Sequence, residues 1–234
     1  MDKSKIITGA IIALGLLMLG LCIKGGIDNI ANRGRQVTVR GLSEREVNAD
    51  LVTWPIVTKE LGNDLPAIYN RIQASNDRIV KFLKDNGLQD DEFSINPPQV
   101  EDREAQSYNT SDIRQRYLVT NVIVVNSKKV DLVRRLIDLQ PQLMREGIAV
   151  VAGDYNYTTT YQFTGLNEIK PEMITEATAN AREAATRFAD DSHSQLGKIV
   201  TASQGQFTIE DRDQYTPYKK NVRVVTSITY ELKN

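Results

Sequence analysis

One apolar stretch near the start of the chain most constrains its organisation. Residues Ile6 to Ile23 (IITGAIIALGLLMLGLCI) hold no charged side chain, and Lys24 follows at once. At about 1.5 Å per residue, a helix over this stretch would be roughly 27 Å long, close to the thickness of a bilayer core. The stretch therefore predicts a transmembrane anchor. A cleaved secretory signal is the alternative, because lysines before an apolar segment, here Lys3 and Lys5, are common to both.

The anchor is preferred because the apolar run is long for a secretory signal and no small-x-small cleavage site closely follows it. Leu21 stands before Cys22 where lipid attachment requires a small residue. The predicted organisation is a transmembrane anchor over residues 1–24, a linker over 25–35 and one domain over 36–234. The protein would then be a single-pass inner-membrane protein with its bulk in the periplasm. With a cleaved signal, the domain would be free in the periplasm.

The charge balance of the chain limits its partners. The sequence holds 29 basic and 30 acidic residues, a net charge of −1. Nucleic-acid binding needs a basic face, so we expect no nucleic-acid partner. Cys22 is the only cysteine and lies in the apolar stretch, which leaves no disulfide within the rest of the chain.

Hydrophobic periodicity predicts an α+β fold. Alternating apolar residues predict strands over 36–40, 50–60, 92–100, 113–126, 155–164, 198–207 and 222–232. Apolar residues three and four apart predict helices over 64–86, 127–139 and 167–191. Gly41 is expected to end the first strand in a turn, and Pro55 to lie at an edge or bulge. The order reads as two similar halves, ββαββ then αβαββ, with helices covering an antiparallel-rich sheet.

Two of the helices carry more specific expectations. Asp64 is placed to cap the first helix and Gly87 to end it. The third helix is predicted to pack very closely on its neighbour, because its inward residues are mostly alanine. These inward residues are Ile174, Ala177, Ala181, Ala184, Ala185 and Phe188.

A search for catalytic chemistry finds little. His193, the only histidine, follows Asp190 and Asp191 at a helix end, where the helix dipole gives it a structural role. The acidic groups 90–92 and 210–213 match no calcium-loop spacing and read as solvated turns. No glycine-rich phosphate loop is present. We therefore predict no catalytic, cofactor-binding or metal-ligating residues, and a protein that is not an enzyme.

The two polar hairpin arms, 101–112 and 210–221, are the best candidates for binding. Exposed tyrosines among polar residues are typical of protein interfaces, although a plain solvated hairpin would look the same. The candidate interaction residues are Tyr108, Asn109, Arg212, Asp213, Tyr215 and Tyr218.

Several segments together resemble the SIMPL-domain family. They are VRGLSE at 39–44, NAD at 48–50, INPP at 95–98, FTGLNEIKPEMI at 163–174, LGKI at 196–199 and QGQF at 204–207. The resemblance implies a bacterial periplasmic or envelope-associated protein. Some members are linked to oxidative-stress defence and some form large homo-oligomers. It assigns no catalytic residues.

The hypothesis from the sequence is a non-enzymatic, membrane-anchored periplasmic domain. It would form a homo-oligomer through strand edges or the two arms, bind an unidentified envelope protein, and support envelope integrity or oxidative-stress tolerance. The alternative is a small-molecule or ion-binding module that uses the groove between the alanine-rich helix and the sheet.

Overall fold

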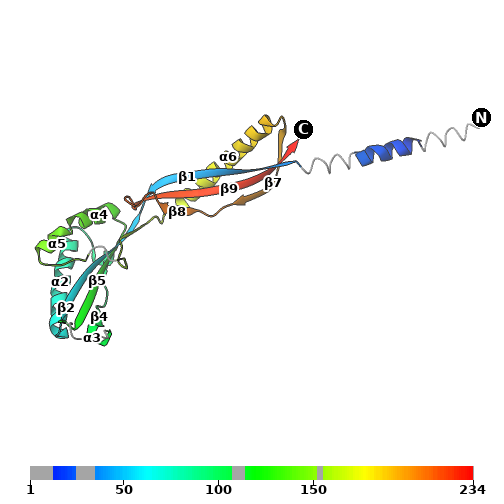
Figure 1. Cartoon of the computed structure of the whole chain (residues 1–234). Helices are drawn as coiled ribbons and strands as arrows, with labels where there is room; N and C mark the ends of the chain where they lie inside the picture. Colours follow the sequence, from blue (N-terminus) through cyan, green and yellow to red (C-terminus); the bar gives the residue numbers. More distant parts are fainter. Residues whose placement is uncertain (1–12, 25–34, 107–113, 152–154, 234) are drawn as a thin grey trace, which may run out of the picture. The chain divides into compact units, whose positions relative to one another are not determined.

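The computed structural model describes residues 13–24, 35–106, 114–151 and 155–233. The fold is α+β with two antiparallel sheets, and the chain divides into two compact units (Figure 1). Unit 1 takes its described residues from Met1–Arg45, Glu168–Thr208 and Val222–Asn234. Unit 2 takes them from Glu46–Asn167 and Ile209–Asn221.

The predicted α+β class agrees with this structure, but the prediction of two successive halves is wrong. The first strand, β1 (Gln36–Asn48), pairs with the last, β9 (Lys219–Lys233), so both ends of the domain contribute to one sheet. Hydrophobic periodicity indicates which residues form strands, but it carries no information about which strands pair. Chain order alone therefore does not identify the partner of β1.

The first sheet has the order β1-β9-β7, with β7 spanning Gln195–Gln204, and β8 (Thr208–Asp211) also pairs with β9. Helix α6 (Leu166–Asp191) runs along β1 and β9 (Figure 1). The core between them consists of Val37, Ala181, Ala185, Ala189, Ile228, Tyr230 and Leu232.

Helix α6 approaches β1 closely at Gly41. A Cβ on Gly41 would lie 1.9 Å from the carbonyl oxygen of Ala177 and 2.4 Å from the nitrogen of Ala181. Gly41 is therefore inside β1 and makes a close contact, and the predicted turn is wrong. The expected tight packing of the alanine stripe is present, although Phe188 is half exposed while Met173 and Ala189 are buried.

The second sheet has the order β3-β5-β2-β6, and β4 also pairs with β5. Its strands are β2 (Leu51–Gly62), β3 (Phe93–Ile95), β4 (Gln99–Asp102), β5 (Tyr117–Ser127) and β6 (Thr160–Gln162). Its helices are α2 (Leu65–Asp85), η1 (Asp90–Glu92), α3 (Arg103–Gln106), α4 (Val130–Leu139) and α5 (Pro141–Arg145). The side chains of Trp54 and Ile56 pack in one core with those of α2, α4 and α5.

Several local predictions for this unit are confirmed. Asp64 caps α2 by accepting a hydrogen bond from the N–H of Ala67, and Gly87 takes the left-handed conformation, with φ of 97°. On one side of β2, Pro55 faces Val124 of β5. On the other side, β6 pairs only with residues 51–53 and does not extend to Pro55, which is the edge position predicted for this proline. The predicted strand over 155–164 is much shorter, because only Thr160–Gln162 pairs.

The predicted transmembrane anchor and inner-membrane location are wrong for the structure as described. Among the described residues of this region, a helix covers 13–24. Residues 6–12 of the predicted stretch lie outside the described residues. Across the described ranges, no helix is both long enough and apolar enough to span a membrane.

Candidate functional site

The turn between β8 and β9 is organised by Asp213. Its carboxylate accepts hydrogen bonds from the backbone N–H groups of Tyr215 (2.8 Å) and Thr216 (2.7 Å). The Thr216 hydroxyl and the Arg212 guanidinium donate to it as well. These donors favour the charged form, Thr216 most strongly and then Arg212, and hold the pKa of Asp213 well below its usual range. Asp213 thereby fixes the backbone from which Tyr215 and Tyr218 project.

Arg212 pairs with carboxylates in and beside this turn. Besides contacting Asp213, it lies 3.4 Å from Glu46, which also accepts a 2.7 Å hydrogen bond from Lys219 Nζ. The hydrogen bond from Lys219 is the main reason that the pKa of Glu46 is lowered. Such exposed pairs contribute little to stability, because water screens them. Arg212 therefore orients the turn and is already paired with two carboxylates.

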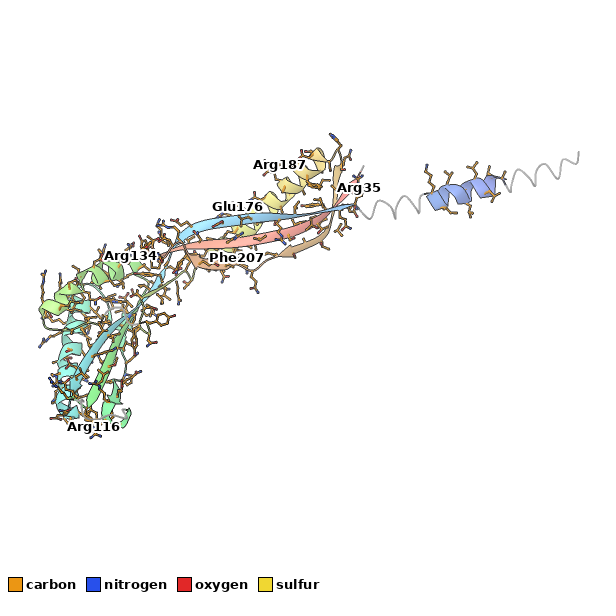
Figure 2. The ribbon with its side chains drawn as sticks, viewed as in Figure 1. Arg35, Arg116, Arg134, Glu176, Arg187 and Phe207 are labelled. Atoms are coloured by element: carbon orange, nitrogen blue, oxygen red, sulfur yellow. The ribbon has the colours of Figure 1, made fainter. Side chains whose placement is uncertain are left out.

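Tyr218 lies at the centre of an aromatic cluster. The guanidinium of Arg134, labelled in Figure 2, stacks on its ring at 3.5 Å from the centroid. Tyr161 meets the same ring edge to face, at 6.2 Å between centroids and 70° between planes. A cavity of about 230 Å³ opens beside the cluster. We call it the tyrosine pocket, and it is lined by Arg134, Ile137, Asp138, Tyr161, Tyr215, Pro217 and Tyr218.

The electrostatics of the tyrosine pocket are balanced. Burial raises the pKa of Tyr161, Arg134 opposes this, and the negative charge of Asp138 adds to it. The phenol of Tyr161 therefore remains protonated at neutral pH and can donate a hydrogen bond. Arg134 and Asp138 are the two charged lining residues and cancel in net charge. The lining thus combines aromatic surface with a hydrogen-bond donor and an acceptor.

The structure brings together two of the predicted interaction residues and explains two more. Tyr215 and Tyr218 line the pocket, while Arg212 and Asp213 hold the turn that carries them. Tyr108 and Asn109 lie outside the described residues.

Sequence reasoning missed the part of the pocket contributed by α4 and β6. Tyr161 stands in an aromatic run, YNYTTTYQFT, which predicts a strand but not a pocket. Nothing in the sequence separates Arg134 from the other charged residues of its helix. Its role depends on the long-range packing of α4 against the turn before β9.

His193 and Glu92, which the search for catalytic chemistry considered, make contacts that stabilise the local structure. His193 follows α6 with φ of 52°, and its N–H donates to the carbonyl of Asp190. Glu92 accepts hydrogen bonds from the Ser127 hydroxyl (2.5 Å) and from Lys129 Nζ (2.6 Å). Within the residues that the structure describes, no three His, Cys, Asp or Glu side chains are grouped as a metal site would require.

Residues of the recognised motifs tie segments together. Asp50 accepts hydrogen bonds from the N–H groups of Thr164 (2.7 Å) and Gly165 (2.9 Å), directly before α6. Within unit 1, the Ser43 hydroxyl donates a 2.8 Å hydrogen bond to the carboxylate of Glu176, and Glu176 is labelled in Figure 2. Asp50 thus holds the segment that precedes α6, and Ser43 links β1 to α6, so these motif residues stabilise the fold.

The fold and site define an α+β protein with two antiparallel sheets, a helix packed on a strand through alanine and glycine, and a small aromatic surface pocket. Residues 37–230 match the family model described as "SIMPL: Protein of unknown function (DUF541)". The chain therefore belongs to the SIMPL family, as its motifs predicted. No curated protein matches the chain.

Proposed function

We propose that this chain is a non-enzymatic SIMPL domain that self-associates and supports envelope integrity or oxidative-stress tolerance. The stress-related role rests on the family resemblance. Self-association has support in the structure, at the outer edge of β7.

Strand β7 carries the proposal. Among the described residues it pairs along one edge only, with β9. The side chains of Ile199 and Val200 are 55% and 42% exposed, and the strand is exposed along most of its length. Lys198 and the register shifts on either side of Ile199 protect part of this edge. Residues 201–204 pair with β9 in regular register and are exposed, so their outer backbone groups can pair with another strand. A second copy of β7 can satisfy these backbone groups by strand addition.

Light scattering on the purified full-length chain tests this proposal. We expect a mass above that of one chain at micromolar concentration, and a decrease in that mass when Ile199→Lys and Val200→Lys are combined. Met144→Lys is the matched control, because Met144 is 53% exposed but lies on α5. Circular dichroism checks that each variant is folded. A parent chain that is monomeric at high micromolar concentration would refute self-association, and an unchanged mass in the double variant would refute the β7 edge.

The alternative of a ligand groove between the alanine-rich helix and the sheet is constrained by the packing at Gly41. At Gly41 the backbone of α6 lies too close to β1 to admit even a methyl group. A ligand therefore cannot lie between α6 and β1 at this point.

A further inference from the structure

The tyrosine pocket is too small for a typical small-molecule site. Its volume is about 230 Å³, below the roughly 300–1,000 Å³ of pockets that enclose drug-sized ligands or cofactors. A group that enters it must be the size of one or two residues. The remainder of such a ligand lies outside, as it does when an extended peptide crosses a shallow aromatic pocket.

The lining favours a neutral, proline-bearing peptide. Tyrosine rings pack well against prolyl rings, and proline-rich segments are recognised by aromatic-lined grooves in this way. Proline brings no N–H that would need a partner on an aromatic surface. Arg134 and Asp138 supply one donor group and one acceptor group with no net charge, which does not favour a strongly charged ligand.

This chain carries a segment of that description. Residues 94–100 read SINPPQV, with no charged side chain and two adjacent prolines. Asn96 and Pro97 are exposed, as are the flanking Ile95 and Val100. A residue that precedes proline is biased toward extended or polyproline conformations, so the segment is already close to the conformation that aromatic grooves bind.

The segment cannot reach the pocket of its own chain. It connects β3 and β4, which pair with one edge of β5, whereas Tyr161 lies on β6 beyond β2. Three strand spacings of about 4.8 Å separate the two edges, or about 14 Å in total. Another copy of the chain has no such restriction.

We propose that the tyrosine pocket of one copy binds the Asn96–Pro98 segment of a second copy. This contact deepens the proposed self-association and rests on it, but it uses a surface distinct from β7. It joins two different patches, so it is heterologous, and repetition would give a closed ring or an open filament.

Binding of a synthetic SINPPQV peptide tests the contact directly. The receptor is the full-length chain carrying Pro97→Ala and Pro98→Ala, so that it cannot occupy its neighbours' pockets. We expect saturable binding by fluorescence anisotropy, weakened at least about tenfold by Tyr218→Ala, as for a central interface tyrosine. Tyr215→Ser is the second pocket variant, because this side chain is 83% exposed and contributes little to folding.

Two controls define specificity. A peptide with both prolines replaced by alanine should bind at least about tenfold more weakly. Tyr155→Ser removes a tyrosine that is 93% exposed outside the pocket, and it should leave affinity unchanged. No saturable binding, or binding indifferent to both pocket variants, overturns the proposal.

The outcomes separate this contact from the β7 edge. If the β7 variants dissociate the chain and the peptide does not bind, self-association stands and the pocket proposal fails. If the peptide binds but the parent chain is monomeric, a second copy is not the occupant, and the proposal fails in that respect. If Pro97→Ala with Pro98→Ala also lowers the mass of the parent chain, both hold.

Discussion

Replacing Gly41 with alanine tests the central packing contact of unit 1. The added Cβ would lie 1.9 Å from the Ala177 carbonyl oxygen, whereas ordinary contact begins near 3.4 Å. Strand and helix must therefore separate by about 1.5 Å, since the obstacle is backbone and cannot rotate away. A gap of about 0.5–1 Å already loses a quarter to a half of the dispersion attraction between packed atoms.

The expected loss is near the upper end for overpacking. Inserting a methylene into a packed core usually costs about 1–3 kcal/mol, and a backbone obstacle places Gly41→Ala at about 3 kcal/mol. For a chain of this size each kcal/mol lowers the Tm by about 2–4 °C, so we expect a decrease of about 6–12 °C. Thermal unfolding followed by circular dichroism at 222 nm measures it, because α6 contributes 26 helical residues.

Two further variants decide whether the reasoning is right. Gly20→Ala adds the same methyl group where no atom lies within 4 Å, and it should leave the Tm unchanged. Ala181→Gly should not rescue Gly41→Ala, because the obstacles are the backbone atoms of residues 177 and 181. The close contact would be refuted if Gly41→Ala had the same Tm as the parent chain, or if adding Ala181→Gly returned the Tm of Gly41→Ala to the parent value.

Two other predictions concern single carboxylates. Asp50→Ala should lower the free energy of unfolding in urea by about 1–2 kcal/mol, since two N–H groups before α6 lose their acceptor. Asp50→Asn should recover part of this loss, and equal stability of all three proteins would contradict the role of these hydrogen bonds. For Glu92, burial raises the pKa, but hydrogen bonds from Lys129 and Ser127 outweigh it and leave the pKa below 4.5. Its stabilisation is therefore present above pH 4.5 and lost as the pH falls through the lowered pKa, so Glu92→Gln should flatten the fall in stability below pH 4.5, and an unchanged profile would exclude this role.

The sequence predicted local structure better than it predicted pairing. Asp64 and Gly87 delimit α2 through backbone chemistry that depends only on neighbouring residues. The prediction for Gly41 is wrong because it too considered only neighbouring residues. A glycine after alternating residues suggested a turn, whereas only the position of α6 shows that Gly41 makes a close contact. The alanine stripe of α6 indicated a close neighbour but not which strand it would be.

The candidate site was predicted in part. The sequence identifies Tyr215 and Tyr218 as candidates because tyrosines within a polar turn are exposed whichever elements surround that turn. Arg134 and Tyr161 could not be found, because they join the pocket through packing between α4, β6 and the turn, which are distant in sequence. The apolar stretch shows the opposite error, since its composition predicted a membrane span, and no helix among the described residues is long and apolar enough to form one.

The two proposed contacts differ in symmetry, and this makes them separable in one experiment. Two antiparallel copies of β7 pair through the same patch, which is isologous and stops at a dimer. The tyrosine pocket and the Asn96–Pro98 segment are different patches, so their contact continues from copy to copy. Pocket variants should therefore leave dimers, whereas β7 variants should leave assemblies joined through the pocket. Dissociation of the pocket variants to monomers would mean that β7 contributes no independent interface.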